Sequence, residues 1–191
     1  MKNYLKIASV LSLIALVCAL IIASVYLLTS PMIAANSLKA ELETRQEIFP
    51  AYDQDKSLEL ETSNSTITSK ILAKDASGNE LGYLYTVSKA NSFGSITLMV
   101  AIDKDNNILQ VEILELNQSF ASTAKEHFQQ NYPTSKENVI YIGIKPEETP
   151  EVGTLTEEDF ESVNTTCGAT YSANLIKELV SVALEDAKGG N

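Results

Sequence analysis

Apolar residues are unevenly distributed along the chain of 191 residues, and the longest apolar run comes first. No charged residue lies between Lys6 and Lys39, and the stretch from Ile7 to Leu28 is almost wholly apolar. As a helix this stretch would be about 33 Å long, which is enough to cross the hydrocarbon core of a membrane. The pattern therefore predicts one membrane-spanning helix, and we expect residues 1–30 to form an anchor.

A cleaved signal peptide and a lipoprotein signal are both less consistent with this run than an anchor is. The run is long for a signal peptide, and no convincing small-residue cleavage site interrupts its end. A lipoprotein signal would need a small residue before the modified cysteine, whereas Val17 precedes Cys18 in the middle of the run.

Lys2 and Lys6 lie before the run, and the next basic residue is Lys39. The positive-inside rule therefore predicts a single-pass protein of the cell membrane, with a cytoplasmic N-terminus and an extracytoplasmic domain.

Alternating and aliphatic-rich segments follow the anchor and predict β-strands. We expect residues 31–62 to form a neck and linker and residues 63–191 to form one domain. Between Asn64 and Gln118, apolar segments are separated by short turns rich in Asp, Asn, Ser and Gly. This arrangement is typical of an antiparallel meander. The predicted strands are Ile67–Lys74, Leu81–Val87, Ile96–Ile102 and Ile108–Leu116.

Helical periodicity replaces the strand pattern after residue 118. Phe120–Gln130 carries apolar residues at a spacing of four, and Tyr171–Lys188 carries two adjacent apolar stripes. Thr156 followed by three acidic residues predicts another helix start, because a hydroxyl cap and acidic side chains suit the positive end of the helix dipole. Val139–Ile144 is one more candidate strand. The chain is therefore predicted to be α+β, with an antiparallel sheet and helices after the membrane helix.

Composition excludes several function classes. The chain has 14 Lys plus Arg against 25 Asp plus Glu, a net charge of −11, which argues against a nucleic-acid partner. Arg45 is the one arginine, so bidentate arginine clamps are essentially missing. Two cysteines and one histidine cannot make a disulfide framework, a thiolate zinc site or a histidine-rich metal site. We therefore expect no metal, and we interpret His127 as a surface residue of its helix.

A small-residue motif precedes the final helix and carries the strongest chemical signal. Residues 164–170 read Asn-Thr-Thr-Cys-Gly-Ala-Thr. Gly168 and Ala169 allow another group to approach the backbone closely, and the Thr170 hydroxyl lies where the first N–H groups of the helix have no partner. Such a helix start is suited to a phosphate. An ordinary N-cap accounts for the same residues, since hydroxyl caps are common.

The motif resembles the Asp-x-x-Ser/Thr-Gly-Ala-Thr sequence of the FMN-binding domain in membrane-anchored flavoproteins. These flavoproteins belong to the Rnf electron transport complex and to the sodium-pumping NADH:quinone reductase. The resemblance continues upstream, where Gly82-Tyr83, 93–96, 100–103 and 111–114 look like the family's strand meander. It implies FMN bonded through its phosphate to Thr170. The other cofactor-binding residues that it implies are Asn164, Thr166, Cys167, Gly168, Ala169, Gln118 and Ser119.

This chain departs from the family pattern at three places. Asn164 replaces the aspartate, Cys167 replaces the serine or threonine, and residues 118–121 read Gln-Ser-Phe-Ala where the family usually has a Glu-Thr-Pro-Gly-type loop. The first two changes fall in the stretch that the flavin transferase recognises. Thr170, Gly168 and Ala169 are kept, and covalent attachment therefore stays our expectation.

The resemblance implies an electron-transfer function. It predicts a flavoprotein that relays electrons within an Rnf-type ferredoxin:NAD oxidoreductase complex that moves sodium ions or protons. The implied partners are the integral membrane subunits, with a flavin transferase for maturation. The flavin supplies the chemistry, so we expect no catalytic side chain and no turnover by this chain alone. Two alternatives stay open: a stand-alone flavinylated protein for extracellular electron transfer, and a surface binding module without flavin.

Overall fold

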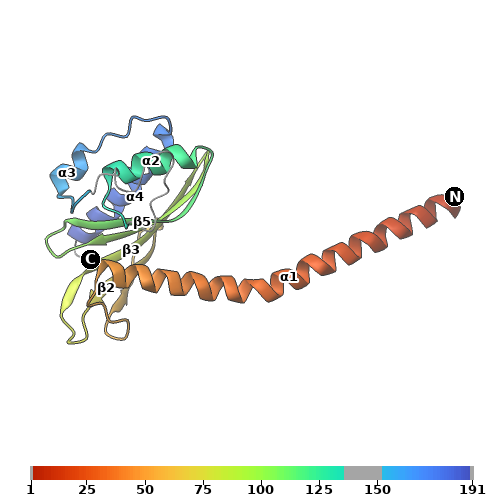
Figure 1. Ribbon diagram of the computed structural model, residues 1–191, viewed down its shortest axis with the longest axis horizontal. Helices are drawn as coiled ribbons and strands as arrows, with labels where there is room; N and C mark the ends of the chain where they lie inside the picture. The colour runs from red at the N-terminus through yellow and green to blue at the C-terminus, as the bar shows by residue number, and fades with distance from the viewer. Residues whose placement is uncertain (1, 136–151, 190–191) are drawn as a thin grey trace. The chain divides into compact units, whose positions relative to one another are not determined.

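The computed structural model describes residues 2–135 and 152–189, and the predicted Val139–Ile144 strand lies outside these ranges. The described chain is α+β, as predicted. It divides into two compact units, Met1–Thr44 and Arg45–Asn191 (Figure 1). The first unit contains most of helix α1 (Lys2–Ile48), and the second contains the sheet and the other helices.

Helix α1 confirms the predicted apolar helix. Its segment Val10–Met32 has a mean hydropathy of 2.8, is long and apolar enough to cross a membrane, and suggests a single-pass anchor. The hydroxyls of Ser24 and Thr29 donate to carbonyl oxygens four residues earlier, so these polar groups are satisfied inside the helix. The helix continues through Pro31 to Ile48.

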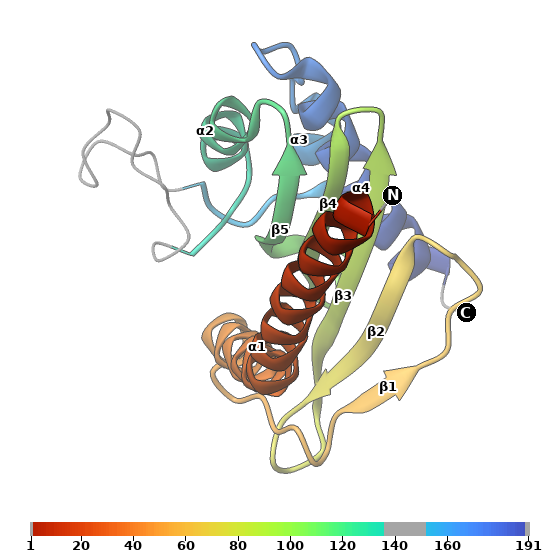
Figure 2. The ribbon, with the colours of Figure 1, turned by 90° about the vertical axis from the view of Figure 1, so that its right-hand side faces the viewer.

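The sheet is an antiparallel meander in which every strand pairs with its neighbours in sequence, in the order β1-β2-β3-β4-β5 (Figure 2). The four predicted strands are confirmed, and three of them extend a few residues beyond their predicted ends. The three-residue strand β1 at the sheet edge was not predicted. The strands are β1 (Leu58–Leu60), β2 (Ile67–Lys74), β3 (Glu80–Asn91), β4 (Gly94–Ile102) and β5 (Ile108–Gln118).

Three helices follow the sheet in the described chain: α2 (Ala121–Asn131), α3 (Glu157–Ser162) and α4 (Thr170–Gly189). Thr156 caps α3 in the predicted way, since its side chain accepts from the Asp159 N–H while the Asp159 carboxylate accepts from the Thr156 N–H. The Asp159 carboxylate also accepts from the Thr156 hydroxyl at 2.6 Å, and this bond, together with the one from the Thr156 N–H, lowers the pKa of Asp159. The predicted helix start, with Thr156 as its hydroxyl cap, is therefore confirmed.

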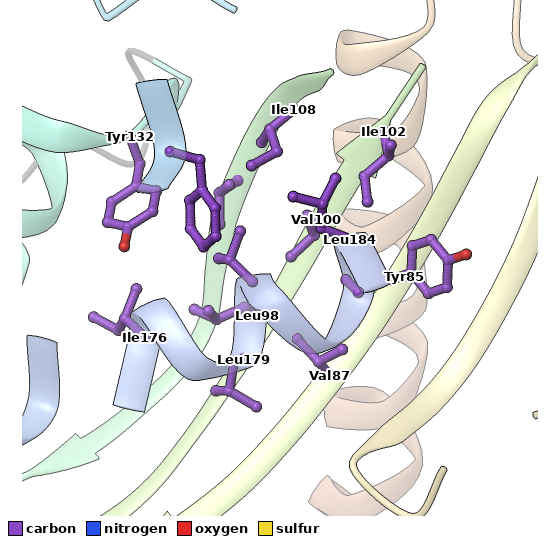
Figure 3. Packing of buried hydrophobic residues seen from close by; sticks show 14 of the residues in the cluster. Tyr85, Val87, Leu98, Val100, Ile102, Ile108, Tyr132, Ile176, Leu179 and Leu184 are labelled. Carbon is purple, nitrogen blue, oxygen red and sulfur yellow. The ribbon is translucent and has the colours of Figure 1, made fainter. Parts of the chain in front are cut away.

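Helix α4 buries its double apolar stripe against one face of the sheet. In Figure 3 its side chains Leu179 and Leu184 lie beside Val87 and Leu98 of the central strands. All six predicted stripe residues are buried: Leu175, Ile176, Leu179, Val180, Ala183 and Leu184. The opposite face packs a smaller cluster that includes Phe49, Tyr52, Ile71, Leu84 and Met99. Because both faces are covered, β4 is buried along most of its length.

One ion pair is buried between the sheet and the C-terminal half of α4. Lys70 of β2 is 4% exposed, and its Nζ lies 2.6 Å from the Asp186 carboxylate. The ammonium also lies over the rings of Tyr83 and Tyr85, at 5.5 and 5.6 Å from their centroids. Burial raises the pKa of Tyr85, and the negative charge of Asp186 raises it further. The pairing fixes this half of α4 to the sheet.

Candidate functional site

The motif before α4 folds into two small turns held by its own side chains. The Asn164 Oδ1 accepts a hydrogen bond from the Thr166 N–H at 2.9 Å, and the Cys167 Sγ accepts one from the Ala169 N–H at 3.4 Å. Thr165 donates to the Asn174 side chain one turn into the helix. The polar side chains of the motif therefore replace the backbone pairing that regular structure would give.

Thr170 is the first residue of α4 and is half-buried. Its hydroxyl donates to the Cys167 carbonyl oxygen at 2.6 Å and accepts from the Cys167 N–H at 3.3 Å. No acidic residue lies in the first turn of the helix, so its positive end is not neutralised there. The residue thus places a hydroxyl oxygen at a helix start whose dipole favours an anion.

Close packing beside Thr170 explains the glycine and the alanine. A Cβ added to Gly168 would lie 3.2 Å from the Cγ2 of Thr123 on α2, so only a glycine fits there without displacement. Ala169 is 5% exposed and packs into the domain. Gly168 itself is exposed on its other side. Glycine at position 168 therefore allows α2 to lie close to the start of α4.

His127 ties α2 to the same motif, and the prediction of a surface histidine is wrong. The ring is buried, and its Nε2 lies 2.7 Å from the Asn164 carbonyl oxygen. Its Nδ1 has no hydrogen-bond partner among the described residues, so the tautomer that carries the proton on Nε2 donates to Asn164. The spacing of His127 from Ala124 and Phe128 places it on the buried face of α2. That spacing was the signal available in the sequence.

Gln118 joins three segments at the end of the sheet. Its side chain is buried, accepts from the Ser172 hydroxyl at 2.9 Å and donates to the Asn91 Oδ1 at 3.3 Å. Ser172 lies in the first turn of α4, and Asn91 ends β3. Ser119, the next residue, is exposed. The structure therefore brings the predicted residue Gln118 close to the start of α4, where it holds the β3–β4 turn, β5 and α4 together.

Two exposed aromatic rings at this end of the sheet, those of Phe93 and Tyr171, were not among the predicted site residues. Phe93, in the β3–β4 turn, and Tyr171, which follows Thr170, pack with ring centroids 5.1 Å apart and planes inclined by 30°. They are 39% and 69% exposed. The available signal was weak, because a turn aromatic and a helix aromatic that lie far apart in sequence become neighbours only through the fold.

No metal centre accompanies these residues in the described chain. Within residues 2–135 and 152–189, no group of three His, Cys, Asp or Glu side chains could hold a metal ion. Both cysteines are free thiols, and Cys167 is half-buried in the motif. The arrangement as a whole offers the Thr170 hydroxyl at a helix start, the buried Gln118 amide and the exposed rings of Phe93 and Tyr171. These groups suit a ligand with a phosphate and a flat ring, and they supply no acid–base pair.

Comparisons with known families agree with this geometry. Residues 1–48 match the family model for the RnfG N-terminal region, and residues 93–185 match the model for the FMN-binding domain. A search of curated proteins gives no match. The first match contains the apolar helix, and the second contains every predicted site residue from Gln118 to Thr170. Together the two matches make the chain similar to the RnfG-like FMN-binding proteins, and they support a flavin-binding Rnf subunit in general.

Proposed function

We propose that this protein carries FMN as a phosphoester on Thr170 and relays electrons within an Rnf-type ion-translocating complex. The FMN-binding match supports the cofactor, and the RnfG match supports assembly with membrane subunits. The covalent proposal rests mainly on the position of the Thr170 hydroxyl at the start of α4, next to the small residues Gly168 and Ala169. The helix α1 would anchor the domain, with its N-terminus in the cytoplasm and the flavin outside.

The residues present fit a phosphate monoester at this position. The positive end of the helix dipole favours negative charge at the first turn of α4, and the lack of an acidic residue in that turn removes a source of repulsion. This local feature matters because the whole chain has a net charge of −11 and would otherwise repel an anionic cofactor. A covalent bond also retains the cofactor where no intracellular pool replaces it.

Attachment needs only one nucleophile from this chain. The Thr170 Oγ1 would form the bond to phosphorus and lose its proton to a base of the transferase. With a flavin dinucleotide as donor, the phosphoanhydride bond would break and a nucleoside monophosphate would leave with the electron pair. The esterified oxygen can no longer donate to the Cys167 carbonyl, but it can still accept from the Cys167 N–H.

The two departures from the family motif preserve the local hydrogen bonds. Asn164 accepts from the Thr166 N–H through its side-chain oxygen, as an aspartate in the same turn would. Cys167 accepts from the Ala169 N–H through sulfur, as a serine or threonine oxygen would. The shape around Thr170 therefore supports recognition by the transferase despite both changes.

When bound, the flavin would supply one- or two-electron transfer, while the protein fixes its position and tunes its environment. Thr170 would tether it, and Gly168, Ala169, Thr166, Cys167 and Asn164 would surround the phosphate. Gln118 would hold the neighbouring strand end and α4 together. None of these groups needs to exchange a proton with a substrate, and we therefore assign no catalytic side chain.

The test is ultraviolet fluorescence of the denatured protein in a gel, after production with an active flavin transferase. We expect a fluorescent band for the native chain, no fluorescence for Thr170→Ala, and full fluorescence for the control Thr154→Ala. Thr154 is an exposed threonine outside the motif, so the control removes a hydroxyl without changing any proposed cofactor-binding residue. A dark native band, with the transferase active on another substrate, would contradict covalent attachment.

A second experiment separates a component of the complex from a stand-alone carrier. Pull-down of the tagged, full-length protein from detergent-solubilised membranes should recover integral membrane subunits in a fixed ratio. Recovery of the fluorescent protein alone, under a detergent that keeps other complexes intact, would contradict assembly and favour the stand-alone carrier.

A further inference from the structure

We infer that the Phe93–Tyr171 pair is the binding surface for the isoalloxazine ring of the flavin carried on Thr170. The inference rests on the proposed function, because the tether at Thr170 brings the ring to this surface. It adds two residues that neither the motif nor the family match assigns a role. It also names the chemistry that recognises the ring, which is stacking on aromatic side chains rather than hydrogen bonding to charged groups.

The exposure of the two rings is the first argument. Phe93 is 39% exposed and Tyr171 is 69% exposed, although their ring centroids lie only 5.1 Å apart. Aromatic rings that serve stability alone are usually buried, because removing apolar area from water is what stabilises the fold. Here the pair leaves much of its area uncovered. A flat, conjugated ligand can cover such a surface and gain stacking energy.

The position of the aromatic pair indicates that the ligand of this surface is the flavin ring tethered at Thr170. Tyr171 directly follows Thr170, so a group esterified to the Thr170 hydroxyl starts one residue away from the Tyr171 ring. Any free planar ligand would lose translational entropy on association, whereas a tethered ring is already at high effective concentration. The proposed tether and one of the two rings therefore belong to adjacent residues at the start of α4.

Both rings are held by backbone that is already fixed. The Phe93 N–H donates to the Asn91 Oδ1 at 2.9 Å, and the same oxygen accepts from the Gln118 side chain. Gln118 in turn accepts from Ser172, one residue after Tyr171. This chain of hydrogen bonds links the turn that carries Phe93 to the helix that carries Tyr171. The surface is therefore pre-organised, which lowers the cost of binding a ring to it.

The β3–β4 turn is further fixed by its contact with β5. Gly94 pairs with Gln118, and its φ of +131° is a conformation that favours glycine. A Cβ at this position would lie 1.7 Å from the Asn117 carbonyl oxygen. Phe93 therefore cannot move away with its turn unless the pairing of β4 with β5 is lost.

The experiment uses the full-length, flavinylated protein in detergent and measures two quantities on each variant. Fluorescence of the denatured band reports how much flavin is attached. Quenching of the folded protein's flavin fluorescence by iodide reports how far the ring is exposed. The variants are Tyr171→Leu and Phe93→Leu, with Tyr171→Phe to keep the ring and Phe120→Leu to remove an exposed aromatic outside the pair. Phe120 is 59% exposed and precedes α2. All four substitutions leave the charge unchanged, so electrostatic repulsion of iodide stays constant.

We expect Tyr171→Leu and Phe93→Leu to keep the denatured band bright and to raise the population of undocked ring roughly fivefold, equivalent to about 1 kcal/mol. Tyr171→Phe and Phe120→Leu should stay close to the native quenching. Equal quenching in all variants with bright bands would overturn the inference while leaving covalent attachment intact. An equal rise for Phe120→Leu would also overturn the assignment to this pair. A dark band for the native protein would instead contradict the proposed function.

Discussion

The two ends of α4 differ in what surrounds them. At the N-terminal end, Thr170 is half-buried and Tyr171 is exposed. The residues next to them belong to turns and are small. Towards the C-terminal end, Leu179 and Ala183 are fully buried and Asp186 pairs with buried Lys70. One helix thus combines an end that is open to a ligand with an end that is fixed to the sheet.

The difference shows how a surface site gains precision from a distant part of the fold. A hydroxyl at a free helix end would move with its fraying first turn. Here the buried stripe of α4 and the Lys70–Asp186 pair fix the helix axis, and Gln118 fixes its first turn through Ser172. We therefore expect changes at the C-terminal half to affect stability, and changes at the N-terminal end to affect flavin attachment and ring position.

The largest effect on stability is expected from Lys70→Met. Removing the ammonium leaves the Asp186 carboxylate mostly buried without the cation that lies 2.6 Å away. Loss of one partner of a buried pair costs about 3 kcal/mol or more. Urea unfolding of the unit Arg45–Asn191, measured on the full-length protein in detergent, should show this loss, while denatured-gel fluorescence should stay at the native level.

The double variant Lys70→Met with Asp186→Leu is the matched control. It removes both charges, so no unpaired carboxylate remains, and stability should return to within about 1.5 kcal/mol of the native protein. If the double variant were as unstable as Lys70→Met, packing of the Lys70 side chain over Tyr83 and Tyr85 would be the dominant contribution instead.

Gly168→Ala should destabilise the fold less than Lys70→Met does, and it should reduce flavin attachment more. The new methyl would meet the Thr123 Cγ2 at 3.2 Å, and overpacking of this kind costs about 1 kcal/mol. The loss of backbone freedom in the unfolded chain offsets part of that cost. We expect reduced band fluorescence with a nearly native unfolding midpoint.

Thr123→Ser is the companion variant, because it removes the methyl group that the new Cβ would contact. Combined with Gly168→Ala, it should restore band fluorescence. A double variant that stays dim would show that the alanine methyl blocks the approach to Thr170 directly, rather than by shifting the motif against α2.

The smallest expected effect is the loss of stability at alkaline pH that comes from the ionisation of buried tyrosines. Burial raises the pKa of Tyr85 and Tyr132 above the ordinary value of 10.0, and the charge of Asp186 adds to the shift at Tyr85. The native state therefore keeps protons that the unfolded state loses, so this contribution is complete below pH 10.0 and declines above it. Unfolding measured at about pH 9 and about pH 11 should show a shallower decline for Tyr85→Phe than for the native chain.

Much of the fold could be predicted because its hydrophobic periods are clear. The strand Ile67–Lys74 has the predicted bounds, and the other predicted strands and helices of the described chain differ by a few residues at their ends. The short strand Leu58–Leu60 was missed because its residues are mostly exposed and because three residues are too few to show an alternating pattern. Glu112 was also unpredictable as a fully buried residue, because its partners at Thr134 and Ser135 come from the segment after α2.

The candidate site was predicted less completely than the fold. The motif from Asn164 to Thr170 is contiguous, so its role could be proposed from sequence. The contacts that hold it come from other elements: His127 from α2 and Gln118 from the end of β5. Gln118 was named through the family resemblance, whereas the contacts of His127 and Phe93 depend on how the elements pack. Such long-range juxtapositions leave no local pattern in the chain.

The close approach at Gly94 has a consequence for mutational tolerance. Because the Asn117 carbonyl occupies the space of a side chain at this position, a library randomised at residue 94 should return glycine almost exclusively after selection for folding. Ser92 and Phe93, the two residues before it, are exposed and leave room for other side chains. Selection for cofactor colour could therefore vary the aromatic at residue 93 on a turn whose backbone stays constant, which makes this hairpin a practical place to alter the flavin's surroundings.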